Sequence, residues 1–343
     1  MSSPVAARAA LPAPRPRFAA ALGSSLGPLL GLAAVFLFFA LWAGPPFYSW
    51  YSQVTVLTQS VIVAAGALGM TWVIIAGGID LSVGSIIALS TVVIARLLQA
   101  GVPPLVSALA GVAVGGLCGL VNGLLITRLG LVPFIITLGT LLVFRGAATG
   151  LAREQKIDAP ITWLNDMLTK FPAPSWMLVA WGVWLTALLA VVVALLLGRT
   201  VLGRYAFAIG SNEQTARLCG VRVERMKLYI YTIGGLLTGF AGLMQFSRLT
   251  VGDPTAAKGM ELDIIAAVVI GGGSLNGGQG RVGGSLAGAL LMTVIRSGLS
   301  MKGVPNWVQD VLTGGIIVAA VALDRLRSKG GRSAPGSALP ASR

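Results

Sequence analysis

The chain contains no histidine, and this absence excludes several kinds of enzyme. There can be no Ser-His-Asp triad and no HExxH zinc site. The only two cysteines are Cys118, in an apolar run, and Cys219, in a polar loop, so neither a CxxC pair nor a disulfide is expected. Gly-Lys dipeptides are also absent, which excludes the usual ATP-binding P-loop. We therefore expect a protein that is not itself an enzyme and has no catalytic residue, metal or cofactor.

Charged residues are scarce as well. They make up 10% of the 343 residues, whereas hydrophobic residues make up 55%, and the mean hydropathy is +0.86. Soluble domains carry about 25% charged residues, so lipid is the expected solvent. In lipid only helices and closed barrels satisfy the backbone, and the apolar runs lack the alternation of barrel strands. We predict an all-α polytopic membrane protein with about ten transmembrane helices, near residues 26–43, 54–76, 83–100, 105–127, 132–150, 176–198, 228–250, 262–275, 282–300 and 306–323.

The net charge of +14 would suggest nucleic acid as a partner in a soluble protein. Here 16 of the 25 Lys and Arg residues lie in segments that ten spans and a cytoplasmic N-terminus would place inside the cell. This asymmetry follows the positive-inside rule, so both termini are expected in the cytoplasm and nucleic acid is not expected to bind. Residues 1–24 and 327–343 are predicted to be disordered cytoplasmic tails around one transmembrane domain at 25–326. The first apolar run is too long for a cleaved signal peptide, so we expect a retained span.

Glycine is abundant, with 46 residues, and much of it is periodic. In "GVAVGGLCGLVNG" a glycine recurs every four residues and marks one helix face, at Gly111, Gly115, Gly119 and Gly123. "GLLTG" (235–239) and "GSLAG" (284–288) repeat this spacing. Small faces let helix backbones approach closely, so packing is favoured over a glycine-lined pore.

Two segments interrupt the apolar pattern in a similar way. "VIIAGGIDLSVGS" (73–85) and "VVIGGGSLNGGQGRVGGS" (268–285) each run from a β-branched stretch into glycines and hydroxyls and then into a second helix. They lie in opposite halves of the chain. Interrupted helices in matching positions are typical of internally repeated transporters, near the substrate path. The sequence thus indicates a possible internal repeat.

The polar segment 199–227 is predicted to hold a short helix outside the bilayer. Ser211 followed by Gln214 forms a capping box, Glu213 lies in the first turn, and Gly220 can end the helix. A helix of about two turns at 212–219 is not stable alone. It either docks on another protein or rests on the membrane surface, and the residues alone leave both open.

Four motifs, spread over about 54–323, resemble the membrane permease of bacterial ABC sugar importers of the ribose/xylose/galactose type, the second carbohydrate-uptake class. They are "GGIDLSVGS" (77–85), "VPFIITLGTLLVFRG" (132–146), "GRYAFAIGSNEQTARLCGVRVERMKLYIY" (203–231) and "ELDIIAAVVIGGGSLNGGQGRVGGSLAGAL" (261–290). "GGGSLNGG" departs from the family's usual GGTSLxGG, which bears on substrate preference rather than class.

The resemblance implies a homodimer in the bacterial inner (plasma) membrane, with an ABC ATPase subunit below and a periplasmic sugar-binding protein above. It implies that 199–227 is the coupling loop. The residues implied to contact the ATPase are Ser211, Asn212, Glu213, Gln214, Ala216, Arg217, Leu218 and Gly220.

A sugar path needs side chains that donate and accept hydrogen bonds. Each candidate also has a structural reading, because Ser and Thr often bond their own helix and Asn often joins helices. The candidates within the predicted spans are Gln59, Thr71, Trp72, Asp80, Ser82, Ser85, Asn122, Thr137, Thr140, Gln245 and Asn276.

Asp80 is the strongest of these candidates, since an intramembrane carboxylate usually faces a cavity or a partner. Alternatively, Asp80 or Ser82 caps the helix that begins near Val83. Arg145 and Arg296, near span ends, are expected to be snorkelling anchors. Asp80 stands nearly alone among acids within the spans, which disfavours an ion-coupled carrier. A nucleoside, a furanose-like signal molecule or a branched-chain amino acid remains an alternative substrate.

Overall fold

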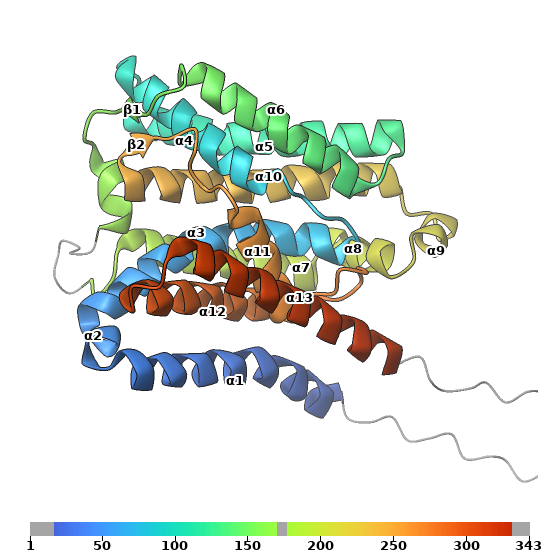
Figure 1. Cartoon of the computed structure of the whole chain (residues 1–343). Coiled ribbons are helices and arrows are strands. Elements are labelled where there is room, and N and C mark those ends of the chain that lie inside the picture. Colours follow the sequence, from blue (N-terminus) through green and yellow to red (C-terminus); the bar gives the residue numbers. More distant parts are fainter. Residues whose placement is uncertain (1–16, 170–176, 331–343) are drawn as a thin grey trace, which may run out of the picture.

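Figure 1 shows the computed structural model of the chain, which describes residues 17–169 and 177–330, with side chains for 27–169 and 177–322. Helices dominate, and most of the long ones lie roughly parallel or antiparallel to one another. The elements are α1 (Arg17–Ala43), α2 (Pro45–Tyr48), α3 (Trp50–Ile75), α4 (Val83–Gln99), α5 (Pro104–Leu129), α6 (Pro133–Leu151), β1 (Ile157–Asp158), the 3₁₀ helix η1 (Trp163–Leu168), α7 (Trp181–Arg199), α8 (Val201–Ser211), α9 (Glu213–Leu218), α10 (Val223–Leu249), β2 (Val251–Gly252), α11 (Met260–Ile270), α12 (Val282–Met301) and α13 (Asn306–Gly330).

The all-α polytopic class is confirmed, but the count of about ten spans is not. Each predicted span overlaps one helix. Within the described residues, six helices are long and apolar enough to cross a membrane: α3, α5, α6, α7, α10 and α12. Three more apolar segments are shorter, at Gly27–Ala43, Val83–Gln99 and Asn306–Ala322. Helix α11 has only 11 residues, so at 1.5 Å per residue it covers about half of a 30 Å hydrocarbon core.

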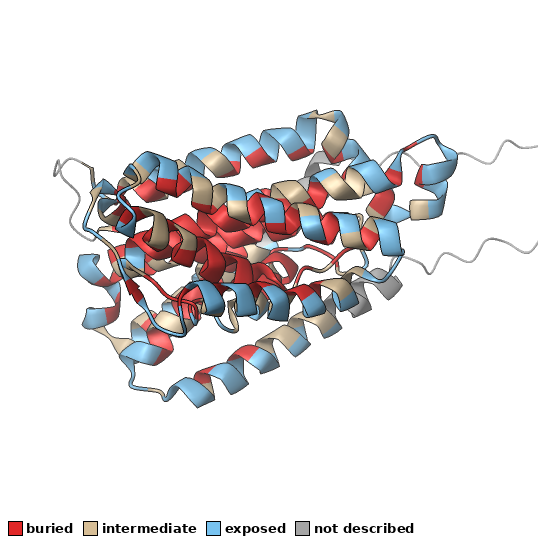
Figure 2. Cartoon of the chain, turned by 90° about the horizontal axis from the view of Figure 1, so that it is seen from above, coloured by how far each residue is buried: buried red, intermediate tan, exposed pale blue. Residues whose placement is uncertain are grey.

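Helix α3 is the centre of the bundle. In its most apolar window 94% of the residues are buried, against 28% in α6 and in α7. It packs against α7, α10, α11 and α12, and Figure 2 shows the buried residues concentrated in the middle of the molecule. A helix that is apolar on all sides is stable there because protein surrounds it. The apolar side chains that α6 and α7 expose suit contact with lipid.

The predicted packing role of the glycines is confirmed between α5 and α10. A Cβ atom added at Gly115 would lie 2.5 Å from the carbonyl oxygen of Gly235 and from the Cα atom of Gly239. A Cβ atom at Gly119 would collide with the backbone of Tyr231. The stripe of α5 therefore lies directly on "GLLTG" of α10, and the two backbones touch as small-residue faces allow.

The glycines of "GSLAG" also face backbone. A side chain at Gly284 would meet Gly271, and one at Gly288 would meet Ala267. These contacts hold the short helix α11 against α12. A side chain larger than hydrogen at either position would push the two elements apart.

Two features differ from the sequence prediction. A two-stranded antiparallel ladder joins β1 to β2, pairing Ile157 with Gly252, because the loops after α6 and α10 meet at one end of the bundle. Helix α1 begins at Arg17, inside the predicted 1–24 tail, and α13 continues to Gly330, past residue 327. The rest of the two predicted tails, 1–16 and 331–343, lies outside the described residues.

Candidate substrate pathway and coupling segment

The first interrupted segment, after α3, is a helix break, as predicted. The N–H of Gly77 donates to the carbonyl of Ile74 and the N–H of Gly78 to the carbonyl of Val73, both at 2.9 Å. This bond pair is the Schellman ending of a helix. Gly77 has φ 79°, a backbone conformation that only glycine adopts at little cost.

The second interrupted segment, after α11, ends its helix with the same bonds. Gly272, with φ 92°, donates to the carbonyl of Val269, and Gly273 donates to that of Val268. The stretches "VIIAGG" and "VVIGGG" therefore have the same local structure, and each break connects a helix to the next one (α4 or α12).

Asp80 lies in the first break and is 4% exposed. Its Oδ1 atom accepts the N–H of Ser82 at 2.8 Å and the O–H of Ser82 at 2.6 Å. The side-chain amide of Asn122, in α5, donates to Asp80 Oδ2 at 3.4 Å and to Ser82 Oγ at 2.9 Å. Thr140, in α6, donates to Asn122 Oδ1 at 2.7 Å. Five predicted pathway residues thus meet in one place, which we call the Asp80 cluster: Asp80, Ser82, Asn122, Thr137 and Thr140.

Thr137 completes the cluster by donating to the carbonyl of Ile79 at 3.1 Å. All five side chains are buried. Each has at least one hydrogen bond, and most of these bonds are within the cluster. No cationic side chain of the described residues pairs with Asp80. The cluster joins the break to α5 and α6 and leaves little hydrogen-bonding capacity for another molecule.

The predicted capping of α4 by a side chain is wrong in detail. Ser82 is the N-cap residue, but its side chain makes no bond to the helix and donates to Asp80 instead. Asp80 accepts an N–H two residues along, which is an Asx turn rather than an N-cap. The pair fixes the turn that precedes α4.

The other predicted candidates lie elsewhere. Trp72, Ser85 and Gln245 are buried, and each has a polar atom without a partner among the described residues. Thr71 shares a 2.7 Å hydrogen bond with Ser285 of α12. Asn276 is exposed in the loop between α11 and α12. These five therefore do not form one site with the Asp80 cluster.

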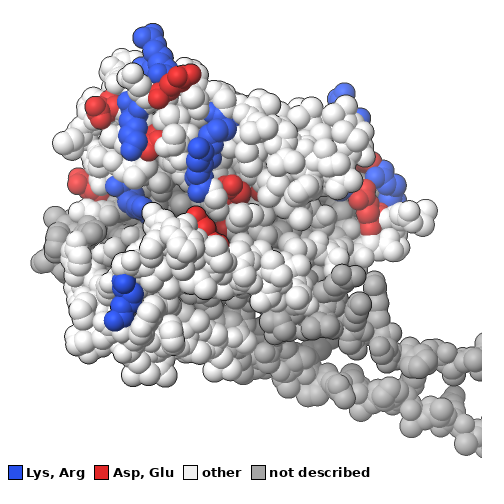
Figure 3. All heavy atoms as spheres, in the orientation of Figure 1, with Lys and Arg blue, Asp and Glu red and all other residues white. Residues whose placement is uncertain are grey.

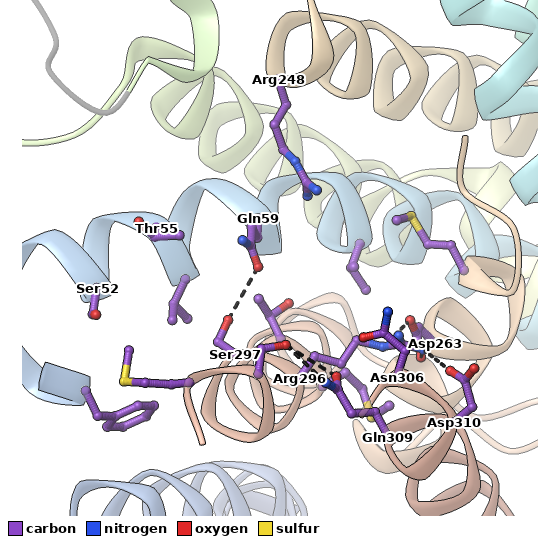
Figure 4. A pocket seen from close by; sticks show the side chains of 18 of the residues that line it. Ser52, Thr55, Gln59, Arg248, Asp263, Arg296, Ser297, Asn306, Gln309 and Asp310 are labelled. Atoms are coloured by element: carbon purple, nitrogen blue, oxygen red, sulfur yellow. Dashed lines mark hydrogen bonds and ion pairs between the residues drawn. The ribbon is translucent and has the colours of Figure 1, made fainter. Parts of the chain in front are cut away.

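A cavity of about 770 Å³ lies at the end of the bundle that holds α2 and the end of α10. Helices α3, α10, α11, α12 and α13 all contribute lining residues, and Gln59 is the one predicted candidate among them. Figure 4 shows Arg248 extending from α10 toward Gln59 of α3, with Ser297 of α12 beside it. We call this cavity the outer pocket.

Two charged residues that contradict the sequence prediction, Arg296 and Asp263, lie in the outer pocket. Arg296 makes a two-point ion pair with Asp263, Nε to Oδ2 at 2.8 Å and Nη2 to Oδ1 at 3.0 Å. Asp310 of α13 lies 3.8 Å from the same guanidinium. Arg296 is therefore not a snorkelling anchor, and Asp80 is not nearly alone, since Asp263 is also a buried acid within a predicted span. The sequence did contain a sign of this ion pair, because Asp263 and Arg296 lie in consecutive apolar runs.

Arg145 is not a snorkelling anchor either. Its Nη1 atom donates to the carbonyls of Pro254 and Ala256, at 2.9 and 2.7 Å. The arginine of α6 thus holds the loop between β2 and α11. Its guanidinium is satisfied by protein carbonyls rather than by lipid headgroups.

The segment at 199–227 folds as two helices followed by the start of α10. The predicted capping box at Ser211 and Gln214 is wrong by one residue: Ser211 ends α8, and the side chain of Asn212 accepts the N–H of Thr215 at 2.9 Å. The predicted ending at Gly220 is correct, since its N–H donates to the carbonyl of Arg217 at 3.0 Å. Helix α9 protrudes from the bundle in Figure 1.

Ion pairs hold α9 against the start of α10. Glu213 bonds Lys227 at 2.7 Å and Arg217 at 3.2 Å, and Arg217 also pairs with Glu224. Burial raises the pKa of Glu213, but the bonds from Lys227 and Arg217 outweigh this and keep it below its ordinary value. Glu213 therefore remains ionised at neutral pH. Leu218, at the tip, is 89% exposed.

Three backbone segments meet beside the coupling segment, and we call their contact the glycine junction. The N–H of Gly278, in the second break, donates to the carbonyl of Ile75 at the end of α3, at 2.8 Å. Gly210, near the end of α8, lies against both: a Cβ atom there would overlap the carbonyl oxygen of Ile75 and lie 2.5 Å from the nitrogen of Gly278. Helix α8 thus touches both helix breaks with no side chain between them.

Comparisons with known proteins show where this architecture belongs. Residues 52–321 match the family of branched-chain amino acid transport system permease components. The chain belongs to this permease family. It is 40% identical to the ribose import permease protein of Bacillus subtilis (strain 168) over 314 residues, covering 88% of this chain and 93% of that protein.

Two further relatives of the permease also carry sugar names. The fructose import permease protein of Rhizobium meliloti is 37% identical, covering 87% of this chain and 84% of that protein. The D-allose transport system permease protein of Escherichia coli (strain K12) is 37% identical, covering 83% and 87%. No solved structure matches. The resemblance predicted from the four motifs is confirmed.

The surface of the permease is that of a multi-pass membrane protein. Figure 3 shows the charged side chains gathered toward the two ends of the molecule, around β1 and β2 and around α9, with uncharged surface between them on this face. Charged groups prefer the aqueous borders of a bilayer. The first residue of α1 and the last of α13 lie at the same end as α9 (Figure 1).

Proposed function

We propose that the permease forms the membrane pathway of an ATP-binding cassette importer for a monosaccharide. The observation that carries the proposal is the set of relatives named as import permeases for ribose, fructose and D-allose, which match more than 80% of this chain. Sugar is therefore favoured over the branched-chain amino acids that the family description names. We further propose a homodimer in the bacterial inner membrane that receives its sugar from a periplasmic binding protein.

ATP hydrolysis is assigned to a separate ATPase subunit that docks on α9. Three features support this assignment: α9 protrudes, its tip exposes Leu218, and ion pairs with α10 hold it in place. An exposed apolar side chain surrounded by charged residues is typical of a protein-binding surface. The coupling residues proposed are the eight of the sequence analysis, with Asn212 rather than Ser211 as the cap.

The glycine junction offers a route from the ATPase to the membrane. A movement of α9 pulls α8, and Gly210 transmits it by direct backbone contact to both helix breaks. The two helix breaks have the same hydrogen-bonded ending, which supports an internal repeat. The ten helices that overlap the predicted spans would supply ten membrane crossings if the short helices α4 and α11 each complete a crossing together with the break beside them. The positive-inside asymmetry and the shared position of the helix ends with α9 support cytoplasmic termini.

The function is tested by uptake in proteoliposomes that contain the permease with the ATPase and binding protein encoded beside its gene. Radiolabelled ribose, xylose, galactose, fructose, allose and arabinose are compared with leucine and adenosine. We expect ATP-dependent uptake of one or a few sugars and none of leucine. ATP-dependent uptake of leucine or adenosine alone would contradict the sugar assignment.

Coupling is tested with Leu218→Asp and Gly210→Ala. The first replaces the exposed apolar side chain of Leu218 with a charge and should lower co-purification of the ATPase. The second should leave the ATPase bound but lower uptake per assembled complex at least tenfold, because the added methyl separates α8 from the breaks. Gly198→Ala, at a helix position with open space around it, is the matched control. Normal uptake by both variants would remove the coupling role.

Orientation is tested by labelling single cysteines at Ser2, Asp158, Glu213 and Ser342 in a cysteine-free background. An impermeant thiol reagent should reach only the Asp158 site in intact cells. Labelling of the Glu213 site would reverse the orientation and, with it, the proposed docking face. Ser2 and Ser342 lie outside the described residues.

A further inference from the structure

The outer pocket contains charged groups of two kinds. Arg296 of α12 pairs with Asp263 of α11 and lies 3.8 Å from Asp310 of α13, so one negative charge of this group stays uncompensated. Arg248, near the end of α10, and Lys258, in the loop before α11, have no hydrogen-bond or ion-pair partner among the described residues, and both are exposed. Five N–H donors of a guanidinium therefore face a cavity without an acceptor. Because Arg248 is exposed in the cavity, water hydrates these donors in the free permease, and a ligand can take the place of that water.

Gln59 provides a second free donor close to the first. Its Oε1 atom accepts a long hydrogen bond from Ser297, 3.4 Å, while no bond uses its amide nitrogen. Figure 4 shows the Arg248 head pointing into the space above Gln59. The two side chains come from α10 and α3, which line opposite sides of that space, so a small molecule between them would contact both.

The remaining lining restricts what this molecule can be. Val63, Met260 and Met292 supply apolar surface, and Ser52 and Ser297 supply hydroxyls. Ligand sites commonly have volumes of about 300–1,000 Å³ and combine apolar walls with a few placed polar groups. A ring with an apolar face and several hydroxyls meets this description. Three cations and two carboxylates line the cavity, and this near balance of charge suits a neutral ligand.

We propose that the outer pocket is a binding station for a neutral monosaccharide on its way through the permease. Arg248 and the amide of Gln59 hydrogen-bond ring hydroxyls, and the Arg296–Asp263 pair closes the lower side. This assignment rests on the proposed import of sugar and adds the residues that hold the sugar after the binding protein releases it.

The station lies at the end of the bundle away from α9, so a sugar entering from the binding protein reaches it before the helix breaks. The Arg248 guanidinium and the Gln59 amide nitrogen are both hydrogen-bond donors, whereas sugar hydroxyls both donate and accept. Acceptors in the pocket include the Oε1 atom of Gln59, the carboxylate of Asp310 and the hydroxyls of Ser52 and Ser297. A hydroxyl between Arg248 and the Oε1 atom of Gln59 would be satisfied in both senses.

The test uses Arg248→Gln and Gln59→Leu in the complete importer in proteoliposomes. Hydrogen bonds to a charged donor are strong, so Arg248→Gln should lower kcat/KM for uptake about 10- to 100-fold, and Gln59→Leu about 10-fold. Arg153→Gln, which removes an exposed arginine of the outer loop, is the control and should leave uptake unchanged. Assembly with the ATPase is measured for every variant by size-exclusion chromatography.

A panel of monodeoxy analogues of the transported sugar separates ligand contact from a structural effect. If Arg248 binds one hydroxyl, the analogue that lacks this hydroxyl should lose much less than the parent sugar on Arg248→Gln, whereas the other analogues should lose as much. The same binding protein feeds both importers, so its own preference cancels in the ratio. Equal losses for all analogues, or unchanged uptake of the parent sugar, would overturn the assignment.

Two other outcomes of these uptake experiments can be told apart from those of the analogue panel. Absence of sugar uptake by the unmodified importer contradicts the proposed function rather than the station. Competition by a sugar acid stronger than by the neutral sugar, and lost in Arg248→Gln, would show that the unpaired cations bind an anion. That result would overturn the neutral-monosaccharide assignment.

Discussion

The Asp80 cluster and the outer pocket are two polar regions inside one apolar bundle, and they differ in what their polar groups bind. In the cluster, the side chains of the first break, α5 and α6 bond mainly one another. In the outer pocket, Arg248 and the amide nitrogen of Gln59 face a cavity without partners. A buried acid is thus poor evidence for a pathway when its neighbours already satisfy it.

The difference has a simple physical basis. A buried polar group that is fully bonded stabilises one arrangement of helices, whereas a donor exposed in a cavity is bonded to water and can exchange that water for a ligand. We therefore assign the Asp80 cluster to the positioning of α4, α5 and α6 around the break. We assign the outer pocket to substrate. The following experiments test this division, in order of decreasing expected effect.

Asp80→Ala should have the largest effect. It leaves the N–H and O–H of Ser82 without their acceptor and removes one of the two acceptors of the Asn122 amide, and each stranded buried donor costs about 1–3 kcal/mol. The amount of assembled permease, measured by size-exclusion chromatography, should fall several-fold. Asp80→Asn keeps one acceptor oxygen and should assemble and transport close to normally, with Asp80→Ser between the two. Loss of uptake by Asp80→Asn with normal assembly would instead make Asp80 a charged pathway residue.

Thr140→Val should have a smaller effect. It removes the hydroxyl that donates to Asn122 while keeping the shape of the side chain, and one such bond contributes about 1 kcal/mol. Thermal unfolding in detergent should show a lowered midpoint. The control is Thr127→Val, whose hydroxyl bonds only carbonyls of its own helix. An equal shift in both variants would mean that the Thr140–Asn122 bond adds nothing.

Ser82→Ala and Ser85→Ala form a matched pair three residues apart. Ser82 Oγ has two partners in the Asp80 cluster, so its loss should lower the unfolding midpoint. Ser85 Oγ is buried and without a partner, so Ser85→Ala should leave the midpoint unchanged or raise it, by less than about 1 kcal/mol in stability. Uptake should be normal for Ser85→Ala. If uptake were lost with assembly intact, Ser85 would belong to the pathway.

Lys156→Met should have the smallest effect and shows what a polar contact is worth where water can replace it. Lys156 is 65% exposed and pairs with Asp253 at 3.2 Å. Asp253 is buried but also accepts from Thr255, and a pair whose cation is this exposed contributes about 0–1 kcal/mol. Unfolding midpoints at low and high salt should differ from those of the unmodified permease only slightly, and least at high salt.

The same pair predicts a pH dependence. Burial raises the pKa of Asp253, but bonds from Thr255 and Lys156 outweigh it and hold the pKa below its ordinary value. The contribution to stability is therefore complete above the unfolded value of about 3.9 and is lost as the pH falls through the lower folded value. The difference between Lys156→Met and the unmodified permease should disappear there. A difference that persists in acid would implicate packing rather than charge.

Some parts of the site were open to sequence reasoning because they depend on neighbours in the chain. The break after α3 needs glycine at Gly77 and Gly78, and the ending of α9 needs Gly220. The cap of α9 was misplaced by one residue because Ser211 and Asn212 are both good caps, and the end of α8 decides between them.

Apolar runs, glycine spacing and the four motifs are local patterns, and by themselves they determined that this chain is an all-α membrane permease with helix breaks and close helix contacts. Two other decisions needed the tertiary structure. It placed Asp80 with Asn122 and Thr140, and it left Arg248 beside Gln59, almost 190 residues earlier in the chain, without a partner. The reason is that hydrogen-bond satisfaction depends on which distant groups come within about 3 Å of each other. In a bundle whose helices are apolar on most sides, no periodicity of the sequence specifies those neighbours.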